Sequence, residues 1–168
     1  MVRNSLRPDE ILGLLAAAPA EIAAAAKALT VAETEAAPRA GQWSLVELLA
    51  HLRACADVWG GAMAAIADGE PGPLRAVNPL TWVERTDYRT LPFNVSLRAY
   101  TEQRQDLLPQ LRRLPAAGWE RTVVVTGAGR PLQRSVLFYG RWLAGHERSH
   151  RRQIWDTAAA VRGTLQGG

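Results

Sequence analysis

Residues 44–52 read SLVELLAHL, and this stretch is the strongest indication of the fold in the chain. Ser44 and Glu47 have the spacing of a capping box, in which each side chain accepts a hydrogen bond from a backbone amide of the first helical turn. Apolar residues then recur at helical spacing as far as Ile66, and Gly69 and Pro71 end the pattern. We therefore predict a helix that begins at Ser44 and carries His51 on its apolar stripe.

Three further segments have the same helical periodicity. The first spans residues 8–29; its proline at position 8 suits a first helical turn, and Pro19 should kink it. The other two span about 94–114 and 135–161, the last with a serine at its start as the cap. The chain thus contains four long amphipathic helices.

The connections between these helices are also informative. A proline-rich segment over 68–93, with one short helix expected at 80–85, is long enough to be a functional cover. Two short strands at 122–126 and 131–133 predict a small β-hairpin before the last helix. We predict an all-α fold, a four-helix bundle with long crossover connections, as a single domain over 1–168.

The composition excludes several classes of protein. No apolar run approaches the ~20 residues that a membrane-spanning helix needs, and the N-terminus has no secretory signal. The single cysteine, Cys55, excludes an internal disulfide and is typical of a reducing compartment, so we expect a cytoplasmic protein with no membrane association. The formal net charge is +4, but the arginines are scattered and form no basic stripe, so we expect no nucleic-acid partner.

The chain has 3 histidines, and two of them, His146 and His150, lie four residues apart in the predicted last helix. That spacing places them on one helix face, where both imidazoles can bind a single ion. If His51 faces this pair across the bundle, the three nitrogens form a metal site with an open coordination position. The alternative is three separate histidines in the core, each needing its own hydrogen-bond partner.

Residues 146–150 also match H-E-x-x-H, the pattern of zinc proteases in which the glutamate is the general base. Such proteases need a third ligand further along the chain, and Asp156 is the only acidic or histidine side chain that follows. We therefore do not favour a protease. Glu147 lies about 100° around the helix from His146, so we expect it at the surface, with a general base as the alternative.

Two motifs together resemble a known family. The first is GQWSLVELLAHL at 41–52, and the second is HERSHRRQI at 146–154. With a similarity over nearly the whole chain, they resemble the DinB-like superfamily, and more narrowly its DinB_2 branch. The resemblance implies a four-helix bundle of unusual connectivity with a divalent metal held by His51, His146 and His150.

Characterised members of that family include thiol S-transferases and isomerases that use low-molecular-weight thiols, and members are often homodimers. The resemblance therefore implies a small-molecule substrate, a low-molecular-weight thiol as co-substrate, and a homodimer. We expect zinc or nickel, with iron or manganese as alternatives. The expected activity is metal-dependent thiol transfer or hydrolysis on a small electrophile; the alternative is a non-catalytic, metal-stabilised bundle that serves as a stress-response or interaction module.

Residues near the ligands have competing interpretations. Glu47, one turn before His51, could orient that ligand, although capping the helix is its simpler role. Gln153, one turn after His150, could orient that ligand or lie at the surface. Cys55 could be a fourth ligand that closes the site, or a small buried apolar residue.

Other segments could complete a pocket. The long connection would close over the site and contribute Trp82 or Tyr88. In the third helix, Tyr100 and Arg104 could reach an acidic substrate group, with core packing and a solvated charge as their default roles. We expect four tryptophans to pack inside the bundle: Trp43, Trp59, Trp142 and Trp155.

Overall fold

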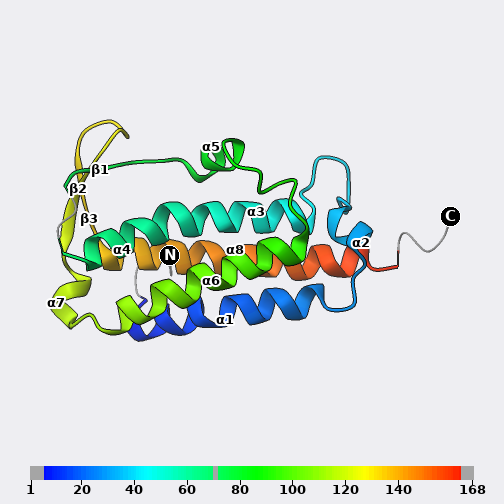
Figure 1. Cartoon of the computed structure of the whole chain (residues 1–168), viewed down its shortest axis with the longest axis horizontal. Helices are drawn as coiled ribbons and strands as arrows, with labels where there is room; N and C mark the ends of the chain where they lie inside the picture. The colour runs from blue at the N-terminus through cyan, green and yellow to red at the C-terminus, as the bar shows by residue number, and fades with distance from the viewer. Residues whose placement is uncertain (1–5, 70–71, 164–168) are drawn as a thin grey trace.

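The fold is built on long helices that run along the longest axis of the molecule (Figure 1). The computed structural model describes residues 6–69 and 72–163. The long helices are α1 (Pro8–Ala26), α3 (Leu45–Cys55) with its continuation α4 (Gly61–Ala67), α6 (Phe93–Arg112) and α8 (Val136–Val161). The predicted all-α bundle is confirmed, and the ends of α1, α6 and α8 lie within a few residues of the predicted ones.

Side-chain caps determine where two of these helices begin. At α3, the Ser44 hydroxyl accepts a hydrogen bond from the Glu47 amide at 3.2 Å, and the Glu47 carboxylate accepts one from the Ser44 amide at 2.9 Å. At α8, the Ser135 hydroxyl accepts a hydrogen bond from the Phe138 amide at 3.0 Å. These bonds satisfy amides that have no partner inside the helix, and they position the two helices that carry the histidines.

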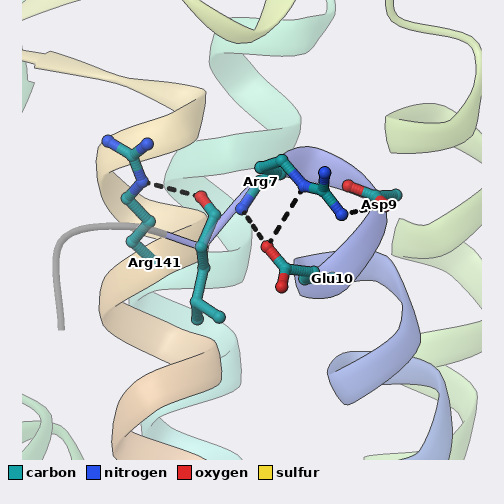
Figure 2. A network of polar contacts seen from close by, with 5 residues as sticks. Arg7, Asp9, Glu10 and Arg141 are labelled. Atoms are coloured by element: carbon teal, nitrogen blue, oxygen red, sulfur yellow. Dashed lines mark hydrogen bonds and ion pairs between the residues drawn. The ribbon is translucent and has the colours of Figure 1, made fainter. Parts of the chain in front are cut away.

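Helix α1 begins with a different set of contacts (Figure 2). The Glu10 carboxylate accepts a hydrogen bond from the Arg7 amide at 2.8 Å. Arg141, on α8, donates its Nε–H to the Leu6 carbonyl at 2.9 Å. The start of α1 is therefore attached to α8, and Pro19 is accommodated within the helix further along.

The second predicted helix is interrupted by a turn of π-helix, η1 (Ala56–Gly60), between α3 and α4. A π-helical turn contains an additional residue, so α4 is out of phase with α3. The prediction of one continuous α-helix is wrong here, because the apolar spacing continues through the turn without a visible break.

A small sheet lies at one end of the bundle. Strands β2 (Thr122–Thr126) and β3 (Leu132–Ser135) pair antiparallel, with Val123 opposite Arg134, which confirms the predicted hairpin. A third strand, β1 (Leu74–Arg75), pairs parallel to β2. It was not predicted, because two residues are too few to show an alternating pattern.

Within the described residues there are also three short helices: α2 (Val31–Glu35), α5 (Pro79–Glu84) and α7 (Ala116–Trp119). Helix α5 confirms the short helix expected in the long connection, and it packs against α3. Helix α2 lies at the end of the bundle opposite the sheet (Figure 1). The long connection therefore runs from α4 to the sheet and returns along α3 to the start of α6.

The apolar core fills the bundle in two main clusters, one nearer the sheet and one nearer α2. Helices α1 and α8 approach closely at Gly140, where a Cβ atom would lie 3.2 Å from Ile11, so a larger residue would push them apart. No helix in the described part of the chain is both long and apolar enough to span a bilayer.

Candidate metal centre

The three histidine side chains converge between α3 and α8. His51 Nε2 lies 2.8 Å from His146 Nε2, although the two residues are 95 positions apart in the chain. The ring centroids are 5.1 Å apart for His51 and His146, 4.9 Å for His51 and His150, and 4.5 Å for His146 and His150. The structure thus brings the three rings together, whereas the ligand atoms that all lie within 4.8 Å of one another are those of His51, Cys55 and His146.

The separation of the facing nitrogens suits a shared ion. Zinc–nitrogen bonds of about 2.0–2.1 Å place two ligand nitrogens about 3.3 Å apart at tetrahedral angles and about 2.9 Å apart at right angles. The 2.8 Å between His51 and His146 is close to the lower of these values. A hydrogen bond between two neutral imidazoles has the same length but involves only two rings. A third imidazole in the cluster favours the ion.

The surroundings favour the neutral form of His51 and His150, which is the form that binds metals. Burial lowers the pKa of His51 to about 4, and the charges of His150, His146 and Arg89 act in the same direction. Burial also lowers the pKa of His150, against an opposing contribution from Gln153. At neutral pH these two imidazoles therefore offer lone pairs without first having to lose protons.

Gln153 and Glu47 differ in their relation to the ligands. The Gln153 side-chain oxygen lies 2.9 Å from His150 Nδ1. If this nitrogen carries the proton, Nε2 keeps the lone pair, so Gln153 is positioned to orient a ligand. The Glu47 carboxylate instead accepts the hydrogen bond from the Ser44 amide, which is the capping role.

Cys55 lies next to the imidazoles, one turn after His51 on α3. Its Sγ is 3.6 Å from His51 Nε2, and the side chain is fully buried. The ligand atoms of His51, Cys55 and His146 all lie within 4.8 Å of one another. Burial, and to a lesser extent the charge of Glu147, raises the pKa of the Cys55 thiol far above its ordinary value, so this sulfur is protonated in the metal-free protein.

Glu147 is buried, with only 1% of its surface exposed, so the expectation of a surface glutamate is wrong. Its carboxylate forms an ion pair with Arg104 of α6, which is equally buried, and the Arg104 guanidinium lies over the Tyr100 ring at 4.9 Å. Burial raises the pKa of Glu147, and the positive charge of Arg104 opposes this. The default expectation of a solvated Arg104 is also wrong: its charge is paired with Glu147 instead of being available to a substrate, whereas Tyr100 lies in the core.

A single carboxylate fixes the long connection to the bundle. Asp57, in η1, accepts hydrogen bonds from Trp82 Nε1 at 2.9 Å, from the Tyr88 hydroxyl at 2.6 Å, and from the Gln103 amide. The Arg53 guanidinium lies 3.7 Å from the Tyr88 ring centroid. Trp82 and Tyr88 pack against Ala50 and Ala54 of α3. Arg89, in the same connection, lies close enough to His51 for its charge to lower the pKa of that imidazole.

Asp57 was not identified from the sequence. Its three partners lie 25, 31 and 46 positions away, and no local motif joins them. The one available signal was an acidic residue in the middle of an apolar helix, which often indicates a buried polar contact.

Two tryptophans contact the histidine cluster. The Trp43 ring is stacked near His150 with a centroid distance of 6.3 Å, and it lies 5.3 Å from His51. The Trp59 ring meets His146 edge-on at 5.2 Å. Both tryptophans are half-buried and pack against the apolar core, as expected, while also bordering the histidines.

The expectation of core packing is wrong for the other two tryptophans. Trp142 is 54% exposed and Trp155 is 46% exposed. Both lie on faces of α8 that no other described element covers completely. Trp142 nevertheless belongs to the site region, because its ring meets Trp59 at a centroid distance of 5.9 Å.

Open cavities reach the histidines along two routes. One, of about 600 Å³, is lined by Trp43, His150 and Gln153 together with the loop before α3. Another, of about 420 Å³, is lined by His146 and Trp142 and extends toward the sheet end. Both lie in the usual size range of small-molecule sites, so the cluster is accessible to ligands.

Comparison with known proteins agrees with this architecture. The DinB superfamily pattern matches residues 14–154. Among solved structures, YfiT from Bacillus subtilis superposes with a TM-score of 0.77 at 18% sequence identity, covering 95% of this chain and 91% of that chain. YfiT is described as a probable metal-dependent hydrolase with an unusual four-helix bundle topology, and at this identity the likeness concerns the fold alone. No curated protein matches the chain. Since the family pattern covers most of the sequence, this protein belongs to the DinB superfamily.

Proposed function

We propose that this protein is a metal-dependent enzyme in which His51, His146 and His150 hold one divalent ion, zinc or nickel. The observation that carries the proposal is the convergence of three imidazole rings at a place that cavities connect to solvent. The description of YfiT as a probable metal-dependent hydrolase supports it. The reaction we propose is hydrolysis of, or thiol transfer to, a small electrophile.

The donor set suits that chemistry. Three neutral ligands leave the full double positive charge of an ion in place, and such an ion supplies Lewis acidity that lowers the pKa of water or of a thiol. The chain's own residues position the ligands: Gln153 holds His150, and Trp43 and Trp59 restrict the motion of the rings. The negative charge of Glu147 does not reduce the positive charge of the site, because Arg104 neutralises the Glu147 carboxylate.

Metal binding by the purified, metal-free protein tests the proposal directly. In calorimetric titration with zinc, the wild type should bind one equivalent. His150→Ala should bind more weakly by over about 100-fold, which exceeds the cost of losing an orienting residue alone. The control is Arg152→Ala, an exposed change on the same helix, which should bind as the wild type does. Equal zinc uptake by His150→Ala and the wild type would overturn the proposed centre.

Activity assays then separate the two proposed reactions. The zinc- and nickel-loaded proteins are offered activated esters for hydrolysis, and glutathione, bacillithiol or mycothiol with a chloronitrobenzene acceptor for thiol transfer. Turnover that the wild type shows and His150→Ala lacks supports an enzyme of the corresponding class. Full metal occupancy without turnover in any assay favours the non-catalytic alternative.

A second function is favoured by the position of Cys55. Tetrahedral zinc with bonds of about 2.3 Å to sulfur and about 2.05 Å to nitrogen separates those two ligand atoms by about 3.6 Å. Cys55 Sγ and His51 Nε2 are 3.6 Å apart. With Cys55 as fourth ligand the shell would be closed, and the ion would stabilise the bundle without catalysing a reaction.

Cobalt(II) in place of zinc distinguishes the open centre from the closed one. An open three-histidine centre should show ligand-field absorption that is the same in the wild type and in Cys55→Ser. A closed centre should add a sulfur-to-cobalt charge-transfer band that Cys55→Ser lacks. Such a band would favour the structural role over the enzyme.

A further inference from the structure

A separate cavity of about 560 Å³ lies beside the histidine cluster at the sheet end of the bundle. Residues of η1, β1, β3 and the first turns of α8 line it. Trp59 belongs to its wall, and the same ring contacts His146 with a centroid distance of 5.2 Å. A molecule in this cavity would therefore lie one side chain away from the candidate metal centre.

Aromatic rings make up one side of this cavity. Trp142 meets Trp59 at 5.9 Å with an interplanar angle of 88°, and it stacks with Phe138 at 6.1 Å and 19°. The Phe138 ring also contacts Tyr139 at 5.4 Å. Aromatic walls of this kind bind flat apolar groups through stacked and edge-on contacts. The exposed Trp142 ring leaves part of this surface open to a ligand.

The charged residues that line the cavity are all positive. Arg75 and Arg134 line it, and no aspartate or glutamate does among the described residues. Neither arginine forms an ion pair with any described residue. The Arg134 guanidinium lies 4.2 Å from the Phe138 centroid, which holds its planar group against the aromatic wall. A guanidinium held in this way can bind a carboxylate with two hydrogen bonds.

We propose that this cavity binds a flat, apolar organic acid, with its ring system against Trp59, Trp142 and Phe138 and its carboxylate on Arg134. The size of the cavity suits one small molecule. If the metal centre is an enzyme as proposed above, this acid is its substrate, and only that part of the inference rests on the proposed function. The binding itself requires no metal, because the cavity supplies all the contacts.

Two ligands that differ only in charge test the inference. Binding of 2-naphthoate and of the neutral 2-naphthamide is measured by calorimetry on chelator-treated protein, so that no ion can hold the carboxylate. Naphthoate should bind about 10- to 100-fold more tightly than naphthamide, the range expected for hydrogen bonds to a charged group. Arg134→Gln should abolish this preference while leaving naphthamide binding within about twofold.

Aromatic variants test the other half of the site. Trp142→Ala should weaken the binding of both ligands about 10-fold or more. Trp155→Ala removes a comparably exposed tryptophan of α8 outside the cavity, and should leave both affinities unchanged. Because both replaced side chains are largely at the surface, the variants should fold, which circular dichroism verifies.

Three results would overturn the inference: equal affinity for the two ligands, no effect of Arg134→Gln on their ratio, or equal losses in the two tryptophan variants. These outcomes are independent of the metal proposal. Zinc uptake without naphthoate binding contradicts the cavity assignment alone. Naphthoate binding without zinc uptake contradicts the metal centre alone.

Discussion

At the scale of single residues, His146 and Glu147 show how two neighbours in the sequence enter different surroundings. His146 turns toward α3 and the cavities, whereas Glu147 turns into the interior and pairs with Arg104. Both partners of this ion pair are buried, so water solvates neither charge. Removing one partner of such a pair lowers the free energy of unfolding strongly, whereas replacing both partners with apolar residues lowers it little.

We therefore predict opposite results for single and double replacements. Glu147→Ala should lower the free energy of unfolding by about 3–5 kcal/mol, because it leaves the Arg104 charge buried without a partner. The double variant Arg104→Met, Glu147→Leu should recover most of that loss. Urea denaturation of the metal-free proteins measures both. A loss below about 1 kcal/mol in Glu147→Ala would mean that water reaches Arg104 and that the pair is not truly buried.

Residue spacing made part of the site predictable. His146 and His150 share a helix face by their four-residue separation alone, and His51 was assigned to an apolar stripe. The burial of Glu147 was not predictable, because the position on the helix does not reveal that α6 places an arginine opposite it. The same limit applies to Arg134 and Phe138, whose cavity exists only after the sheet packs beside α8.

At the scale of elements, Asp57 joins η1, the long connection and α6. Its carboxylate receives three hydrogen bonds, two of them from the segment around α5. We predict that Asp57→Ala lowers the free energy of unfolding by about 2–3 kcal/mol, since several donors lose a charged acceptor. Hydrogen exchange should increase over residues 79–91 and remain unchanged in α1. Uniform exchange changes throughout the chain would contradict this local role.

The pKa of Tyr88 reports whether its hydrogen bond to Asp57 is formed. Burial and the hydrogen bond to Asp57 raise the pKa of Tyr88 to about 12, with Arg53 opposing the shift. A tyrosine ionises near pH 10 in the unfolded chain, so this group stabilises the fold below that pH, and the contribution is lost as the pH rises toward 12. In Asp57→Asn the pKa should fall toward 10. Ultraviolet titration of tyrosinate measures this, with Tyr88→Phe identifying the signal.

The start of α3 offers a test of local sequence signals. Ser44→Ala removes the hydroxyl that accepts from the Glu47 amide, and should cost about 1 kcal/mol of stability. Because the cap lies two turns from His51, the zinc stoichiometry should remain one. If Ser44→Ala abolished zinc binding while keeping its stability, the residue would have a role at the site that its contacts do not indicate.

At the scale of the whole molecule, the candidate metal centre joins α3 to α8, two helices that are far apart in the sequence. An ion that binds only the folded chain should therefore stabilise the entire bundle. At a zinc concentration about 100 times the Kd, the gain should be about 2.7 kcal/mol, which raises Tm by roughly 5–10 °C. Calorimetric scans of the wild type with and without zinc measure this. His51→Ala should show no such rise, and an equal rise in that variant would place the ion elsewhere.

Most of the architecture was predictable because long helices have long repeating patterns. Four periodic segments, two caps and two long connections were enough to predict the bundle, and the match to the family pattern agrees with it. The elements that were not predicted from the sequence are short. Strand β1 has two residues, α7 has four and α2 has five, so none repeats its pattern often enough to be detected, and tertiary contacts determine all three.

The π-helical turn at Ala56–Gly60 implies that chain length at this point matters more than residue identity. Deleting any one of its five residues would let ordinary α-helical hydrogen bonds form. The same deletion would remove the widened turn that places Trp59 against His146. Related chains should therefore tolerate substitutions in this turn far better than the loss of a single codon.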